Sequence, residues 1–318
     1  MVGVGGSRSE RGGWLPVAAL LLVSAAWGVH SVVGVALERQ LSPLQLTVAR
    51  FSIGALLYTP LLPRLRRLPR SALRQLAVTG VLWAVLFPLF FYESLRYISP
   101  VESVLVINTS PLIAALLGRI FLQEKLRTAQ AVGLLIGFAG VGVAVAGSWS
   151  ASGSLLGLLL IALASATFAG YTLSARSLVG RLPVVEMVAA ISIVGALELW
   201  TITLATGNAG LVVEGVIRLN TSGWIELGYV AIVVSTLSYV LYGYGLSHSH
   251  SSSAAALAFY PQVIFTALAQ LAWFGTGIGW LTAVSAVLIL GGVVVSRTSS
   301  RKPGISRFRR GSRSGAPV

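Results

Sequence analysis

The sequence contains no cysteine and no aspartate, and it has only three histidines and nine acidic residues, all glutamate. Without cysteine, neither a disulfide framework nor a thiolate metal site can form. The scattered glutamates and few histidines also give little material for a hydrolytic or metal centre. We therefore expect no catalytic residue, no metal and no cofactor. Charged residues make up 10% of the chain, against about 25% in a soluble domain, which excludes a water-soluble globular protein.

Hydrophobic residues make up 55% of the 318 residues, and the mean hydropathy is +0.85. Apolar runs of roughly 20 residues, the length of a helix that crosses a ~30 Å hydrocarbon core, occur repeatedly along the chain. The first run is longer than the core of a signal peptide, so we expect it to be retained. We predict an all-α integral membrane protein with ten transmembrane helices at 15–37, 43–63, 75–96, 100–122, 128–147, 153–175, 184–206, 223–246, 252–274 and 277–296.

The formal net charge is +14, but the positive residues lie between and after the apolar runs, so we expect no nucleic-acid partner. Arg and Lys gather in the cytoplasmic segments of membrane proteins. With a cytoplasmic N-terminus, 19 of the 23 positive residues fall on that side, the exceptions being Arg39, Arg50, Arg96 and Arg218. We therefore predict that both termini are cytoplasmic.

The two ends of the chain are polar, and we expect both to be disordered. Residues 1–14 form the N-terminal segment, and residues 297–318 form a basic tail that carries seven positive charges. A tail of this composition is expected to lie near anionic lipid headgroups.

A long stretch of the sequence returns 150 residues later, because residues 91–145 align with 241–295 without a gap. The matched pairs are Tyr92 with Tyr242, Pro111 with Pro261, and Gly142 with Gly292. Five helices per repeat is an odd number, so the second copy enters the membrane upside down. We predict two inverted five-helix repeats (5+5), at 15–147 and 153–296. Such repeats are the structural basis of alternating access in transporters.

Three segments carry a family resemblance: SPLQLTVARF at 42–51, SVLVINTSPLIAALLGRIFLQEKL at 103–126 and GLLIGFAGV at 133–141. In these segments the chain resembles the drug/metabolite transporter (DMT) superfamily, specifically its EamA-like ten-helix members, and the likeness extends over roughly 15–296. The resemblance implies a 5+5 carrier in the cell (plasma or inner) membrane that exports small organic metabolites or toxic compounds. In the second half, Trp273–Gly277 stands where family members usually repeat an acidic loop.

The two matched prolines lie near the middle of their apolar runs. Proline lacks a backbone donor, so Pro111 and Pro261 are predicted to kink their helices beside a wet central cavity; plain packing kinks are the alternative. Polar and aromatic residues in deep or repeat-matched positions are the candidates for solute binding, and bundle packing is the alternative for each. These candidates are Trp27, His30, Tyr92, Asn108, Ser110, Phe168, Tyr171, Tyr242, Tyr260 and Gln262.

Ionisable groups within membrane helices are costly and therefore suggest function. Glu93 is our first candidate for proton coupling, because it adjoins the repeat-matched Tyr92. Glu198 is the second, and it could instead neutralise Arg50. His30 is a further titratable candidate, with a hydrogen-bonded core histidine as the alternative.

The sequence thus predicts a secondary transporter that moves a small organic solute (an amino acid, related metabolite or drug-like compound) through the lipid bilayer. Export is favoured by the resemblance alone. Proton coupling, exchange and uniport all fit, as do a monomer and a homodimer. The alternative from another class is a membrane-embedded enzyme that acts on lipid-soluble substrates. A channel would require repeated polar rings or a filter loop, which the sequence does not display.

Overall fold

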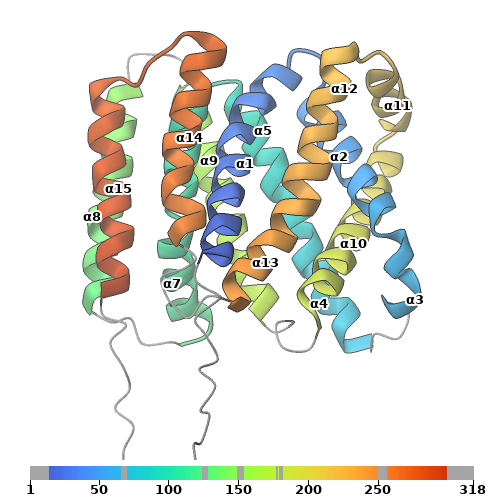
Figure 1. The fold of residues 1–318 in the computed structure, drawn as a ribbon, viewed down its shortest axis with the longest axis horizontal. Coiled ribbons are helices and arrows are strands. Elements are labelled where there is room, and N and C mark those ends of the chain that lie inside the picture. Colours follow the sequence, from blue (N-terminus) through green and yellow to red (C-terminus); the bar gives the residue numbers. More distant parts are fainter. Residues whose placement is uncertain are drawn as a thin grey trace, which may run out of the picture.

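The computed structural model describes residues 14–65, 70–123, 128–148, 154–176, 178, 182–248 and 256–298. Most of the two predicted disordered ends, 1–13 and 299–318, lies outside these residues. Residues 124–126, the end of the second segment that carries the family resemblance, also lie outside them. Every element within the described ranges is a helix (Figure 1). The helices are α1 (Leu15–Leu37), α2 (Pro43–Leu57), η1 (Thr59–Leu61), α3 (Leu62–Leu65), α4 (Arg70–Gly80), η2 (Val81–Leu86), α5 (Phe87–Leu95), α6 (Pro100–Ile107), α7 (Ser110–Phe121), α8 (Thr128–Ser148), α9 (Ser154–Arg176), α10 (Val184–Ala205), α11 (Ala209–Ile217), α12 (Thr221–Gly228), η3 (Tyr229–Leu237), α13 (Ser238–His248), α14 (Ala256–Phe274) and α15 (Trp280–Thr298).

Six of the described helices are long and apolar enough to cross a membrane. They are Leu15–Leu37, Ala72–Leu95, Pro100–Phe121, Leu155–Ala175, Val184–Ala205 and Thr221–Gly245. A seventh span results if Pro43–Leu57 and Thr59–Leu65, which meet at a bend of 50°, are taken together. Three shorter apolar helices occupy Thr128–Val143, Ala258–Phe274 and Trp280–Ser296. This all-helical architecture fits a membrane protein.

Two of the helices begin with the same N-terminal capping arrangement. Ser42 precedes α2 and Ser99 precedes α6, and in each case proline follows as the first helical residue. The serine side chain accepts a hydrogen bond from the backbone amide of Gln45 or Glu102, whose side chain in turn accepts one from the serine amide. These capping boxes satisfy backbone donors that the helix itself leaves open, and they fix sharp helix starts after very short connections.

Helices from the two halves of the sequence pack against one another throughout the bundle. The most extensive contacts join α8 with α15, α1 with α14, α5 with α9, α1 with α13, and α2 with α10. Figure 1 shows α8 and α15 side by side at one edge of the molecule and α1 near its centre. Neither half therefore forms a separate bundle, and residues far apart in the sequence meet in the interior.

The two matched prolines lie in different local structures. The span that contains Pro111 is interrupted at Asn108 and Thr109, and Pro111 lies in the first turn of α7. Pro261 instead lies inside the continuous helix α14. The two halves share a different irregularity, which the sequence did not reveal: η2 and η3 are π-helical segments in the third span and in its counterpart 150 residues later. Isolated π-helical turns occur mostly at functional sites.

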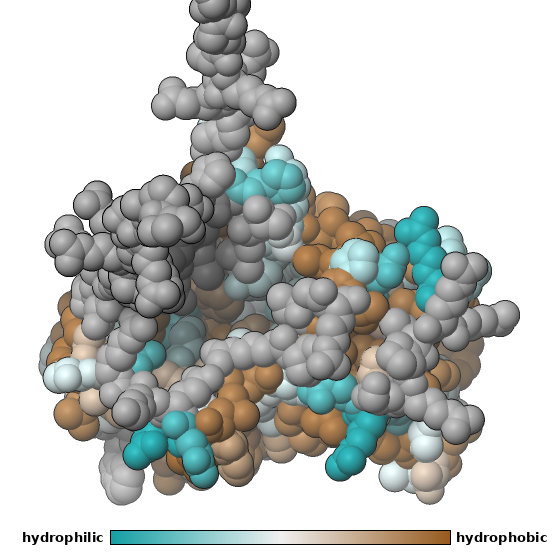
Figure 2. Space-filling model, turned by 90° about the horizontal axis from the view of Figure 1, so that it is seen from below, coloured by the Kyte–Doolittle hydropathy of each residue, from teal (hydrophilic) through white to brown (hydrophobic). Residues whose placement is uncertain are grey.

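The outer surface of the described bundle is strongly apolar. Leu135, Phe121 and Val287 each expose more than 70% of their surface. In the view of Figure 2, hydrophobic side chains dominate the described surface, and hydrophilic ones form a few separate patches. Polar side chains are buried instead, among them Arg50, Asn108 and Gln262. An apolar surface around a polar interior is the arrangement expected when lipid is the solvent.

Candidate functional site

A cavity lies in the middle of the bundle, between helices of both halves. It contains about 480 Å³ of space not filled by protein atoms, counting the part at its open mouth. The lining residues come from α1, α2, α5, α6, α9, η3, α13 and α14, and they are Trp27, His30, Ser31, Arg50, Phe87, Phe91, Val104, Ile107, Phe168, Val234, Tyr239, Phe259 and Gln262.

Aromatic rings form one wall of the cavity. The ring of Trp27 lies 5.5 Å from each of the rings of Tyr239, Tyr242 and Phe259. Its indole nitrogen donates a hydrogen bond to Ser238 Oγ at 2.8 Å. Phe168 continues the wall, with its ring 5.3 Å from that of Phe87. Tilted and edge-on ring pairs at these distances are favourable, so the wall is ordered and offers flat apolar surface.

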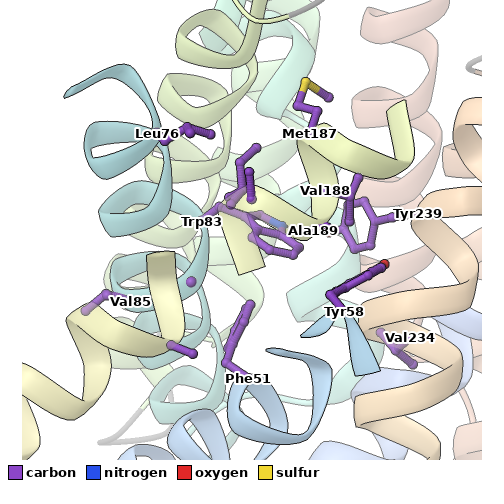
Figure 3. Packing of buried hydrophobic residues seen from close by; sticks show 14 of the residues in the cluster. Phe51, Tyr58, Leu76, Trp83, Val85, Met187, Val188, Ala189, Val234 and Tyr239 are labelled. Carbon is purple, nitrogen blue, oxygen red and sulfur yellow. Dashed lines mark hydrogen bonds between the residues drawn. The ribbon is translucent and has the colours of Figure 1, made fainter. Parts of the chain in front are cut away.

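Trp83 supports this wall from behind. Figure 3 shows Phe51, Trp83 and Tyr239 pointing toward one another in the core. The Trp83 ring meets Phe51 edge-on at 5.0 Å and Tyr239 edge-on at 4.9 Å, and its indole nitrogen donates to the Tyr239 hydroxyl at 2.9 Å. Tyr171 stacks on the other side of Trp83 at 5.8 Å. Tyr171 thus holds the aromatic wall without lining the cavity itself.

The polar part of the cavity is organised around Arg50 on α2, which exposes only 2% of its surface. Its Nε donates to Ser235 Oγ at 2.9 Å, and Nη1 donates to the Tyr92 hydroxyl at 2.8 Å. Nη1 also lies 3.3 Å from His30 Nε2, which is 2.8 Å from the Tyr92 hydroxyl. The guanidinium lies over the Phe51 ring at 5.1 Å. Neutral groups therefore hold this cation.

The hydrogen-bonding capacities of Arg50, Tyr92 and His30 assign the protons of this network. Arg50 can only donate, so Nε2 of His30 must accept in this arrangement. The Tyr92 hydroxyl then accepts from Arg50 and donates its own hydrogen to His30. His30 is thereby neutral, with its proton on Nδ1, and its ring stacks on Phe91 at 5.2 Å. Among the described residues, Arg50 is consequently the only charged one in the cavity lining.

Two buried polar atoms of the lining have no hydrogen-bond partner among the described residues, Ser31 Oγ and Gln262 Oε1. Ser31 and Gln262 expose 1% and 6% of their surface. Buried polar groups are nearly always paired with protein or water. Beside the cavity, therefore, one buried hydroxyl and one buried amide oxygen are without a hydrogen-bond partner among the described residues.

Asn108 and Ser110 belong to a second polar cluster, at the break between α6 and α7. Asn108 Nδ2 donates to the Val104 carbonyl at 2.8 Å, and Ser110 Oγ donates to the Ile107 carbonyl. Ser110 Oγ also lies 3.0 Å from Ser165 Oγ on α9. Side chains thus satisfy the carbonyl that Pro111 cannot bond. Neither Asn108 nor Ser110 is among the cavity-lining residues.

The remaining predicted residues do not line the cavity. Tyr260 packs both against the small cluster around Leu112 and Leu134 and against the large cluster that contains Trp27 and Phe259. Glu93 forms an ion pair with Arg96 at 3.2 Å at the end of α5, with a third of its side chain exposed. Glu198 on α10 lies against Gly80, and no carboxylate of the described residues lies within 4.0 Å of the Arg50 nitrogens. The structure thus does not bring Glu93 or Glu198 together with Arg50.

Of the ten residues predicted to bind the solute, Trp27, His30, Phe168 and Gln262 line the cavity. Tyr92, Tyr171 and Tyr242 contact its lining. Sequence reasoning identified Arg50 as a costly buried charge but did not assign it to the site. Phe87, Phe91, Phe259 and Ser31 were missed because nothing in their sequence context distinguishes them from packing residues. Among the described residues, no group of three His, Cys, Asp or Glu could hold a metal ion.

Known proteins resemble the chain along most of its length. The sequence profile of the EamA-like transporter family matches residues 14–146 and 155–298. An uncharacterized transporter of Bacillus subtilis, YyaM, is 25% identical over 270 residues, which cover 82% of this chain and 87% of the relative. An uncharacterized transporter of Acidianus ambivalens is 25% identical over 252 residues, covering 79% and 92%. One crystal structure, 18% identical, shares the fold with a TM-score of 0.58 and covers 92% of this chain and 98% of its own.

Proposed function

The chain belongs to the EamA-like transporter family, and we propose that it moves a small organic solute across the plasma membrane by alternating access. The solute is an amino acid, a related metabolite or a drug-like compound, and export is the proposed direction. Both termini are proposed to be cytoplasmic, in keeping with the distribution of arginine and lysine.

The central cavity is the observation that carries this proposal. Its lining joins Trp27, Arg50 and Phe91 from the first half to Phe168, Tyr239 and Gln262 from the second. A relative movement of the two halves would therefore change the shape and the opening of one shared site, which is what alternating access requires. Its flat aromatic wall and its few polar groups suit a small organic molecule.

Ten spans in two inverted repeats are part of the proposal. The seven long or bent spans and the three shorter apolar helices of the described residues together give ten. The family profile matches the chain over two stretches of similar length, 14–146 and 155–298. The π-helical segments η2 and η3 recur at the repeat spacing. These observations support the 5+5 arrangement independently of the matched prolines.

Proton coupling remains a further part of the proposal. Glu93 lies at the end of α5 in an ion pair with Arg96, so any proton role for it would act outside the cavity. Glu198 has a buried oxygen, Oε2, without a hydrogen-bond partner among the described residues. Both carboxylates can be tested by replacement with glutamine, which keeps their shape and removes their charge.

The test is uptake and efflux of radiolabelled solutes by the purified protein in sealed vesicles, with and without an imposed pH gradient. The panel contains amino acids, nucleosides, organic acids and cationic dyes. Ser31→Leu fills the cavity, because Ser31 lines it, and Thr201→Leu makes the same kind of change at an exposed position on α10. We expect flux of one solute class, lost in Ser31→Leu and retained in Thr201→Leu.

The coupling variants are measured in the same vesicles. Gradient-driven flux that is lost in Glu93→Gln or Glu198→Gln would identify the proton carrier. Flux that is independent of the gradient and survives both changes would indicate uniport or exchange. No flux of any solute in a monodisperse preparation would refute the transport proposal and return attention to a membrane-embedded enzyme.

A further inference from the structure

The cation in the cavity has no counter-charge among the residues that the structure describes. Arg50 is 98% buried, and its hydrogen-bond partners, Ser235, Tyr92 and His30, are all neutral. The ion pairs of the described residues lie elsewhere and join Arg64 to Glu186, Arg96 to Glu93, and Arg218 to Glu214. Burying a charge without an opposite charge is costly, and hydrogen bonds from neutral groups offset only part of that cost.

The guanidinium also has donors to spare. Arginine carries five N–H donors in a planar fork. The bonds to Ser235, Tyr92 and His30 use Nε and Nη1, and Nη2 has no hydrogen-bond partner among the described residues. Because Arg50 lines the cavity, an acidic group that enters it can reach a guanidinium that is already held in place. A carboxylate is the group whose geometry suits this fork.

We propose that the cavity takes an organic monocarboxylate, whose carboxylate binds Arg50 and whose flat apolar body lies against the wall of Trp27, Phe168 and Phe259. The solute is a net anion rather than a zwitterion or a cation. This assignment rests on the proposed function, because it names the solute class of the same cavity. It makes the solute the counter-ion that the protein does not provide.

The charge of the lining selects against other solute classes. Arg50 is the only charged lining residue, and the assigned protons leave His30 neutral. One cation balances one negative charge, so a phosphate dianion would leave an excess. An amine would meet like charge and no carboxylate. The free oxygens of Ser31 and Gln262 can bond a hydroxyl group of the solute or the second carboxylate oxygen, the latter through the Ser31 hydroxyl.

The experiment is isothermal titration of the purified full-length protein in detergent, without any requirement for transport. The probes share one ring and one chain length and differ only in the head group: 3-phenylpropanoate, 3-phenylpropanamide, 3-phenylpropylamine and L-phenylalanine. Phenyl phosphate adds a dianion. We expect the carboxylate to bind at least about tenfold more tightly than the amide, with the amine and phosphate weaker still. Equal binding of acid and amide, or tighter binding of phenylalanine, would overturn the proposal.

Arg50→Gln then tests the residue. The readout is the ratio of acid to amide affinity, and we expect it to fall to about one. Arg50→Lys keeps the charge but loses the planar fork, so it should retain part of the ratio, and it serves if Arg50→Gln does not fold. Arg96→Gln, at an exposed ion pair, is the matched control and should leave the ratio unchanged. A ratio unaffected by both Arg50 changes would refute the role of Arg50.

The same probes in vesicles separate this inference from the proposed function. Carboxylate binding without flux would refute transport and leave the anion assignment standing. Flux of neutral or cationic solutes without carboxylate binding would refute the anion assignment and leave transport standing.

Discussion

Two adjacent glycines on α15 allow a direct test of how closely the halves of the protein pack. A Cβ atom added at Gly292 would lie 2.6 Å from the Gly133 carbonyl oxygen, 2.6 Å from the Gly137 amide nitrogen and 2.9 Å from Gly137 Cα. All three are backbone atoms of α8, so no side chain can turn aside to make room. A Cβ atom added at Gly291 would meet nothing within 4 Å. The two positions thus differ in packing and share everything else.

The expected magnitudes follow from this difference. Replacing glycine by alanine within a helix stabilises it by up to about 1 kcal/mol, and this gain applies to both positions. Overpacking typically costs about 1–3 kcal/mol, and it applies only to Gly292. We therefore expect Gly292→Ala to be about 2 kcal/mol less stable than Gly291→Ala. At roughly 2 °C per kcal/mol for a large chain, the melting temperatures should differ by about 4 °C.

Thermal unfolding of the two purified variants in one detergent, followed by tryptophan fluorescence, gives the comparison. The wild type should lie between them. If Gly292→Ala melts at or above Gly291→Ala, the backbone contact between α8 and α15 does not exist as described. That result would also remove the close approach of Gly292 to Gly133 and Gly137.

Two further predictions concern pH and motion. Burial raises the pKa of Glu38, just beyond α1, from 4.5 to about 8, while the charge of Arg96 lowers this pKa and that of Glu93 raises it. A raised folded-state pKa favours the neutral acid. The contribution of Glu38 to stability is therefore present at low pH and is lost as the pH rises through 8. The wild-type melting temperature should therefore fall between pH 6 and pH 9, and that fall should be smaller in Glu38→Gln; equal slopes would contradict the assignment. Because the chain has no cysteine, a disulfide between introduced residues is unambiguous: joining α2 to η3 through Gly54→Cys and Thr236→Cys should stop flux, and reduction of the disulfide should restore it. Flux that persists in the oxidised double variant would refute a movement between α2 and η3.

The helices could be predicted well from the sequence, because apolar runs of membrane-spanning length are a strong signal. The first run, predicted at 15–37, coincides with α1. No helix was predicted between the seventh and eighth spans, and α11 was missed, because a nine-residue helix is too short to register as a span. The bend after α2 and the π-helical segments were also missed, since they depend on hydrogen-bond geometry that apolar periodicity does not encode.

The site could be predicted only in part, because burial in this protein is decided by distant partners. Arg50 is held by Ser235, which is 185 residues away in the sequence, and no local sequence pattern indicates that contact. Glu93 was chosen because it follows Tyr92 in the sequence. Successive residues on a helix point about 100° apart, so Tyr92 faces Arg50 while Glu93 meets Arg96 at the surface. Adjacency in sequence was thus a poor guide to adjacency in space.

The contacts between the two halves are of two physical kinds, and the difference bears on how a carrier of this fold would move. Between α8 and α15 the backbones touch at glycines, so separating them would open a void that no side chain could fill. Between α2 and η3, Val48 and Val234 belong to one buried apolar cluster, and a hydrogen bond joins Arg50 to Ser235. A solute can take the place of that hydrogen-bond partner. We therefore expect α8 and α15 to move as one piece while α2 leaves η3, with the carboxylate of the solute holding the charge of Arg50 as Ser235 moves away.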